Sequence, residues 1–346
     1  MRRAAFPALA LGLLAAGSAF AQDAPGAPAS GAVGEAPMLP GSAETPRDGE
    51  RLLPVPTLGP TGDGVPAEGF PATADGAYGA FQRGLYLSAL RIAEPLANLG
   101  DSAAQTLLGE IYAGGFGVPR DEAEAARWYR VAAEAGVPRA QFRYAMMLIE
   151  GEGVTPDEAA ARDLMRQAAD AGEPTAAFNY GQMLIQSSPT GGFTEAARYF
   201  RVAAESGVPD GQYALAQLYA YGQGETQDDT QARRWLREAA IRGHDTARVE
   251  LGIWLINGRG GEANALAGFR WLKGAAERGN AIAINRVAHL YREGIGTPRD
   301  TQAAAMWAVL ARRAGNTDPG LDGFIRGLPQ DMQQRALQDA NRFKAR

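Results

Sequence analysis

The stretch RVAAEAGVP at Arg130–Pro138 recurs almost unchanged as RVAAESGVP at Arg201–Pro209, 71 residues later. A catalytic site is normally built once in a chain, whereas a motif that recurs at a fixed period belongs to a unit that stacks on copies of itself. The duplication therefore predicts a repeat architecture, and it directs attention to further copies.

Six segments share the pattern of this stretch and follow one another at intervals of 36, 35, 36, 36 and 36 residues. They begin at Trp128, Leu164, Tyr199, Trp235, Trp271 and Trp307, and each ends in a glycine. A second set of equivalent positions, here called the small column, carries Gly or Ala in every copy: Gly109, Ala145, Gly181, Ala216, Gly252 and Ala288. Three residues after each of them stands Tyr or Leu. Small and large residues that alternate on one helical face let neighbouring helices pack closely. We expect the tryptophans to be packing residues between repeats.

Each copy reads as a pair of helices. Helix A carries the small column and ends at glycine-rich segments, and helix B begins at a residue that can cap its first turn: Asp121, Asp157, Asp228, Asn264 or Asp300. The third copy departs, because IQSSPTGGFTEAARYF (residues 185–200) lacks the Gly-x-Gly signal. A single pair cannot bury both of its apolar faces, so successive pairs must stack. The fold class predicted is all-α: a right-handed α-solenoid of about six 36-residue helix pairs, with leading and closing helices.

Three parts of the chain are expected. Residues 1–21 combine two arginines, an apolar run and an Ala-x-Ala pattern, and we predict a cleavable signal peptide there. Residues 22–76 contain ten prolines and ten glycines and predict a disordered linker. Residues 77–346 form the solenoid, with repeats at 101–136, 137–172, 173–207, 208–243, 244–279 and 280–315 and a C-terminal cap at 316–346. The expected location is periplasmic or secreted, with no membrane span after signal cleavage.

Composition argues against several function classes. The net charge is −5 and charges of both signs alternate along the chain, so nucleic acid is not expected as a partner. The chain has no cysteine, and its two histidines, His244 and His289, stand in no metal-binding spacing. No serine lies in a Ser-x-x-Lys or Gly-x-Ser-x-Gly motif. We therefore expect no catalytic residue, no metal site and no cofactor.

The recurring pattern small-x-x-Tyr, Gly-x-Gly-Val-x-x-Asp, Ala-x-x-Trp-Tyr-x-x-Ala-Ala-x-x-Gly resembles the Sel1-like repeat family, a branch of the tetratricopeptide-like helical repeats. The resemblance covers about Ala80 to Gly315. It implies an adaptor that binds other proteins, and exported bacterial members include periplasmic regulators of sensor kinases. Some cysteine-rich members have been described as β-lactamases or penicillin-binding proteins, but this chain lacks the cysteines of that subgroup.

The surface that varies while the scaffold repeats is the natural candidate for recognition. Two columns on helix A lie three residues apart, and hence on one helical face. We predict a partner-binding groove there, formed by Arg143, Asn179, Glu250, Arg286, Glu110, Gln182, Gln217 and His289. For each residue the alternative is an ordinary solvated face.

The predicted function is a non-enzymatic periplasmic scaffold that binds protein or peptide and regulates envelope signalling. Its oligomeric state stays open. One alternative is a cell-wall amidohydrolase or β-lactamase-like enzyme. Another is a peptidoglycan-binding module, in which exposed aromatic residues such as Phe116 or Tyr221 stack on sugars.

Overall fold

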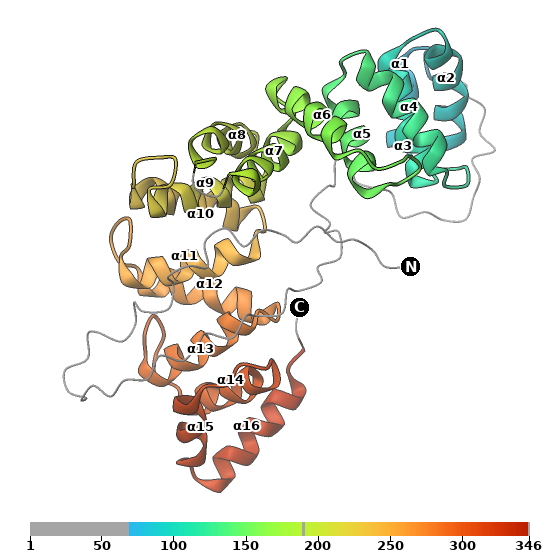
Figure 1. The fold of residues 1–346 in the computed structure, drawn as a ribbon. Helices are drawn as coiled ribbons and strands as arrows, with labels where there is room; N and C mark the ends of the chain where they lie inside the picture. Colours follow the sequence, from blue (N-terminus) through green and yellow to red (C-terminus); the bar gives the residue numbers. More distant parts are fainter. Residues whose placement is uncertain (1–68, 189–190, 345–346) are drawn as a thin grey trace. The chain divides into compact units, whose positions relative to one another are not determined.

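The computed structural model describes residues 69–188 and 191–344. In these two ranges it has 16 α-helices and no strand, which confirms the all-α repeat fold. The chain divides into two compact units, Met1–Ala176 and Ala177–Arg346, drawn in Figure 1. The expected signal peptide and the expected linker up to residue 68 lie outside the described residues.

The first unit contains six helices in its described part. They are α1 (Ala74–Gln82), α2 (Tyr86–Asn98), α3 (Ser102–Gly114), α4 (Glu122–Glu134), α5 (Pro138–Glu150) and α6 (Glu158–Asp170). Each helix packs on the next one along the chain, which is the contact pattern of stacked helix pairs. α1 begins within the last three residues of the expected linker, and its N-cap Thr73 accepts a hydrogen bond from the Gly76 N–H at 3.2 Å.

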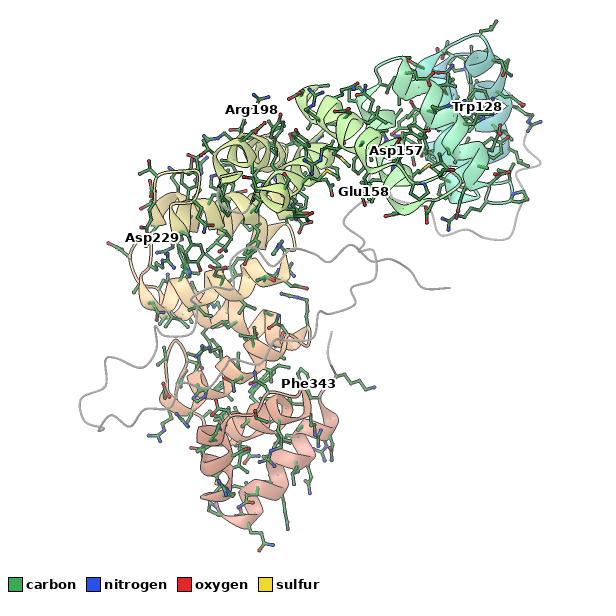
Figure 2. The ribbon with its side chains drawn as sticks, in the orientation of Figure 1. Trp128, Asp157, Glu158, Arg198, Asp229 and Phe343 are labelled. Carbon is green, nitrogen blue, oxygen red and sulfur yellow. The ribbon has the colours of Figure 1, made fainter. Side chains whose placement is uncertain are left out.

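The second unit continues the pattern from within α7 (Pro174–Ser187). Its further helices are α8 (Phe193–Glu205), α9 (Pro209–Tyr221), α10 (Asp229–Ile241), α11 (Asp245–Asn257), α12 (Ala265–Glu277), α13 (Ala281–Glu293), α14 (Thr301–Arg313), α15 (Pro319–Arg326) and α16 (Gln330–Arg342). α14 packs on both α15 and α16, so these last two helices cover the final repeat. Phe343, which follows α16, places its ring 5.1 Å from that of Trp307 (Figure 2).

The predicted start of every helix B with an Asp or Asn cap is confirmed. The side chains of Asp121, Asp157, Asp228, Asn264 and Asp300 each accept a hydrogen bond from a backbone N–H of the first turn. These bonds satisfy donors that have no partner inside the helix. The aspartates and the asparagine therefore fix where helix B begins.

The other end of helix B is satisfied by a contact that the sequence analysis did not anticipate. A side chain eight residues further on, in the next helix A, donates to a carbonyl of the last turn. Gln105 Nε2 donates to the Ala97 carbonyl at 3.0 Å, and Gln212 Nε2 to that of Ala204 at 3.1 Å. Gln141 and Arg248 make the same contact in their repeats. Carbonyls at a helix C-terminus lack intrahelical partners, so this bond joins one repeat to the next.

The small column lets a large side chain of helix B lie directly against the backbone of helix A. A Cβ atom added at Gly109 would lie 2.6 Å from the Tyr129 ring, and one at Gly181 would lie 2.7 Å from the Phe200 ring. Tyr129 and Phe200 are fully buried. The predicted close approach of the two helices is therefore confirmed.

The tryptophans predicted to pack between repeats differ in burial. Trp128 and Trp307 are buried, and Trp128 lies among the helices of the first unit in Figure 2. Trp235 and Trp271 are half-buried and pack against one buried cluster of the second unit, which includes Leu236. All four side chains contribute to the repeat core, but only two of them are fully enclosed.

The Gly-x-Gly loops are contacts between repeats as well as turns. Their second glycine lies against the first turn of the preceding helix B. A Cβ atom added at Gly153 would lie 2.1 Å from the Glu122 carbonyl oxygen. Added Cβ atoms at three later loops would lie 2.1 to 2.3 Å from the equivalent carbonyls: Gly224, Gly260 and Gly296. No side chain fits at such a distance, so the loop motif is a steric requirement for stacking.

The substitution Gly153→Ala tests this close contact. The control is Gly136→Ala, because Gly136 also has a positive φ of 82° but has no neighbour within 4 Å of an added Cβ. The control should cost only the left-handed backbone strain, about 1 to 2 kcal/mol. Gly153→Ala should add an overpacking cost of about 1 to 3 kcal/mol. Urea denaturation of both variants measures the difference, and equal losses of stability would contradict the contact.

Candidate partner-binding surface

The eight residues of the predicted groove lie on the A helices, and none of their side chains is fully exposed. Gln217 is buried and the other seven are half-buried. Polar contacts between elements of consecutive repeats involve Glu110, Arg143, Gln217, Glu250 and His289. The structure thus brings these residues together as local clusters within each unit.

In the first unit the cluster is centred on Glu110 of α3. Arg139 Nη2 lies 2.7 Å and Arg143 Nε 3.6 Å from Glu110 Oε1, so two cations of α5 hold one carboxylate. The Tyr129 hydroxyl of α4 also hydrogen-bonds to Glu110. Burial, together with the charge of Glu110, raises the pKa of Tyr129 well above its usual value. The phenol therefore stays protonated and donates to the carboxylate.

In the second unit the corresponding cluster is centred on Glu250 of α11. Its Oε2 accepts a hydrogen bond from Gln217 Nε2 of α9 at 2.8 Å, and the Tyr213 hydroxyl donates to the same carboxylate. Burial raises the pKa of Glu250, although the hydrogen bonds from Gln217 and Tyr213 and the charge of Arg259 oppose that shift. The Tyr213 ring also stacks on the His244 ring at 4.4 Å.

A third cluster joins α13 to the start of α15. His289 Nε2 lies 2.8 Å from Asp318 Oδ2, and Asn285 Nδ2 donates to the same oxygen at 3.0 Å. Asp318 Oδ1 caps α15 by accepting from the Leu321 N–H. Burial raises the pKa of Asp318, but the hydrogen bonds from Asn285, His289 and the Leu321 backbone outweigh it and hold this pKa well below its usual value.

The remaining groove residues, Asn179 and Gln182 of α7 and Arg286 of α13, are half-buried. Of the two aromatic residues considered for sugar stacking, Phe116 is half-buried, with its ring stacked on Tyr86 at 5.0 Å and edge-on to Phe81 at 5.3 Å. Tyr221 is 38% exposed. Of these two residues, only Tyr221 is therefore exposed enough to stack on a sugar.

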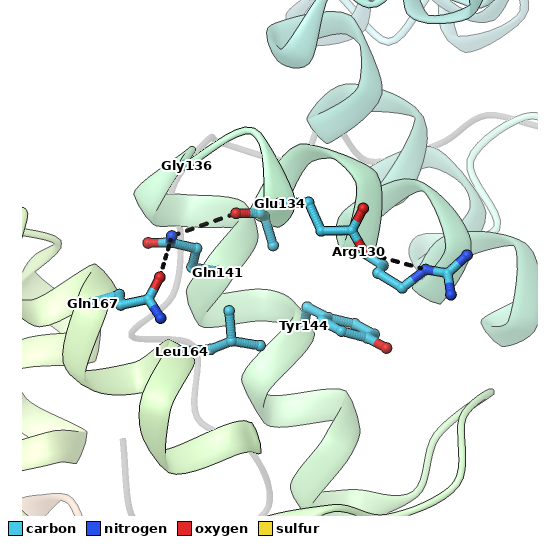
Figure 3. A pocket seen from close by; sticks show the side chains of 8 residues that line it. Arg130, Glu134, Gly136, Gln141, Tyr144, Leu164 and Gln167 are labelled. Atoms are coloured by element: carbon cyan, nitrogen blue, oxygen red, sulfur yellow. Dashed lines mark hydrogen bonds and ion pairs between the residues drawn. The ribbon is translucent and has the colours of Figure 1, made fainter. Parts of the chain in front are cut away.

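An open cavity of about 460 Å³, which was not predicted from the sequence, lies in the first unit where α4, α5 and α6 meet (Figure 3). Its lining includes Arg130, Glu134, Gln141, Tyr144, Leu164 and Gln167. We call it the Leu164 pocket. One sequence signal could have located it: Leu164 is the only member of the helix B column Trp128, Leu164, Tyr199, Trp235, Trp271 and Trp307 that is not aromatic.

Residues 69–188 and 191–344 contain no group of three or more His, Cys, Asp or Glu side chains that could hold a metal ion. Within the same ranges, no helix combines the length and the apolar character that crossing a membrane requires.

Glu250→Gln tests the electrostatics of the second cluster. A carboxyl whose pKa is raised by folding stabilises the folded state below its unfolded pKa, and this contribution is lost as the pH rises through the folded pKa. The amide keeps the size of the side chain and does not titrate. The free energy of unfolding of the variant should therefore rise relative to that of the native chain between pH 5 and pH 8, as measured by urea denaturation. Glu205→Gln, at an exposed position of α8, is the control and should show no such trend.

Comparison with known proteins agrees with the geometry. The Sel1 repeat family model matches six segments, 102–137, 138–173, 174–208, 209–244, 246–280 and 281–316. Each begins one or two residues after the range expected from the period. No curated protein matches the chain.

Two solved structures are similar in both sequence and fold. A Sel1 repeat protein from Oxalobacter formigenes is 28% identical, with a TM-score of 0.59, and the match covers 70% of this chain and 100% of that protein. The protective antigen c5321, present in uropathogenic Escherichia coli strains and displaying an SLR fold, is 25% identical with a TM-score of 0.52; the match covers 79% of this chain and 68% of the antigen. The period, the stacked helix pairs and the six matched segments together show that this chain belongs to the Sel1 repeat family.

Proposed function

We propose that this chain is a non-enzymatic scaffold of the bacterial cell envelope that binds a protein or peptide partner along its A helices and regulates envelope signalling through it. The proposal is based on the array of six Sel1 repeats. Sel1 repeats generally serve as protein–protein interaction scaffolds, and Sel1 repeat proteins are typically non-enzymatic. The signal-like residues 1–21 support an exported location.

The polar clusters favour the A helices as the binding face. Their donors and acceptors are held by side chains of an adjacent repeat: Glu110 by Arg139 and Glu250 by Gln217. A surface whose side chains are already ordered loses little conformational entropy when a partner binds. Half-buried charges also form stronger hydrogen bonds than fully solvated ones. Each unit therefore presents a preorganised polar face.

Apolar positions interrupt this polar face without taking part in the ion pairs. Met146 of α5 and Ile253 of α11 stand in the same column as Glu110 and Gln217 and are half-buried. A protein interface typically combines such apolar contacts with a polar surround. These two positions are suited to reporting on a bound partner, because their replacement leaves the three polar clusters intact.

Site-specific photo-crosslinking in cells tests the proposed face. The photoreactive amino acid p-benzoylphenylalanine, placed at Met146 or Ile253, should form adducts with the same partner protein, identified by mass spectrometry. The matched controls carry it at Ala123 of α4 and Arg237 of α10, which are exposed on B helices. Adduct yield should be at least tenfold lower at the controls. Equal yields at all four positions would reject the A-helix face, and the absence of any protein adduct at Met146 and Ile253 would reject the scaffold role.

A further inference from the structure

The Leu164 pocket occupies a place that other repeats fill with an aromatic ring. At the position of Leu164 the other five copies carry Trp or Tyr, and Trp128 and Trp307 are only 5% and 3% exposed. Trp128 belongs to the same buried cluster as Ala97, and Trp307 to the same cluster as Ala276. The residue equivalent to these two alanines is Ala133, which lines the Leu164 pocket. The second copy thus lacks a ring at this place.

The residue of helix A beside this place also differs in the second copy from its equivalents in most other copies. Four other copies carry Leu or Val there, each at most 1% exposed: Leu108, Leu215, Leu251 and Val287. The second copy carries Tyr144, which is half-buried. In the third copy Tyr180 and Tyr199 occupy both positions, with their rings edge-on at 5.0 Å. The repeat can therefore accommodate a second ring beside the tyrosine of helix A.

The walls of the pocket are held in place from within. Gln141 Nε2 donates to Gln167 Oε1 at 3.1 Å and to the Ala133 carbonyl at 3.4 Å, which links α5 to both α6 and α4 (Figure 3). Leu164 and Tyr144 supply apolar surface, while Arg130 and Glu134 of α4 line the pocket as an ion pair, with Arg130 Nε 4.0 Å from Glu134 Oε1. The lining thus combines apolar surface with polar groups, and fixed polar groups orient a bound side chain.

We propose that the Leu164 pocket accepts an aromatic side chain, Trp above all, from a protein partner of the scaffold. This inference rests on the proposed function and specifies the chemistry that its partner presents. The ring replaces the one that the second copy lacks and packs on Leu164, Ala133 and Tyr144. The Arg130 guanidinium can stack on the ring, and Gln167 Oε1 has a second lone pair for an indole N–H.

The only aromatic residue of the expected linker, Phe70, packs against the buried cluster of the first unit that includes Ala97. Residues 22–68 contain no Phe, Tyr or Trp. This composition favours an occupant that another molecule supplies. A cavity of about 460 Å³ is large enough for a single side chain of this kind but is small for a folded element.

Ligand-observed fluorine NMR with N-acetyl-5-fluorotryptophanamide tests the pocket directly in the chain from residue 22 to residue 346. The native chain should broaden the probe resonance. Leu164→Trp restores the ring found in the other copies and should weaken this binding at least tenfold while leaving the urea midpoint equal or higher. The matched control Leu266→Trp adds a tryptophan at an exposed position of α12 and should bind as the native chain does. Equal binding by all three chains, or no binding by the native chain, would overturn the proposal.

A second variant keeps the test decisive if Leu164→Trp does not fold. Leu164→Tyr reproduces the Tyr180 and Tyr199 pair of the third copy and should also exclude the probe.

The partner is tested by repeating the crosslinking at Met146 in the Leu164→Trp background, where adducts should fall at least tenfold. Undiminished adducts would overturn the assignment of the pocket to the partner but leave the scaffold role standing. Probe binding without any protein adduct would reject the scaffold role instead.

Discussion

The array depends on one steric constraint, the contact of a loop backbone with the backbone of the preceding repeat. At Gly153 an added Cβ would lie 2.1 Å from the Glu122 carbonyl oxygen, and the same approach recurs at Gly224, Gly260 and Gly296. Because the contact is between main chains, it leaves the side chains of the A and B helices free to vary. The stacking of the repeats and the variation of their surfaces are thus separated physically.

The polar clusters show how a repeat protein can carry charge without losing its packing. Glu110, Glu250 and Asp318 are each partly removed from water, which alone would be unfavourable. Each carboxylate has hydrogen-bond donors from a neighbouring element, and the balance differs from site to site. Burial dominates at Glu250 and raises its pKa, whereas hydrogen bonds dominate at Asp318 and lower its pKa. The same face therefore combines sites of different proton affinity.

The fold could be predicted from the sequence because its determinants are local and periodic. Caps such as Asp121, the small column at Gly109 and the loop glycines each have a spacing that can be read along the chain. The clusters could be predicted only in part: the spacing placed Glu110, Gln217 and Glu250 on one face. It indicated neither that Gln217 bonds to Glu250 nor that Arg139 pairs with Glu110. The Leu164 pocket arises because Leu164 is smaller than the Trp or Tyr of the other copies. Whether a smaller side chain leaves a cavity is evident only when the residues packed around α6 are known.

The hydrogen bond from helix A to the end of the preceding helix B has a consequence for how the array melts. Gln105, Gln141, Gln212 and Arg248 each add a hydrogen bond from one repeat to a carbonyl in the last turn of the repeat before it, and this bond couples the unfolding of the two neighbours. At the equivalent position the chain has Ala177, the first residue of the second compact unit, and Ile284. Neither side chain can donate such a bond. The ends of helix B before these two positions therefore lack a hydrogen bond of this kind, which typically contributes about 1 kcal/mol, so the array should melt less cooperatively there than at the other four junctions.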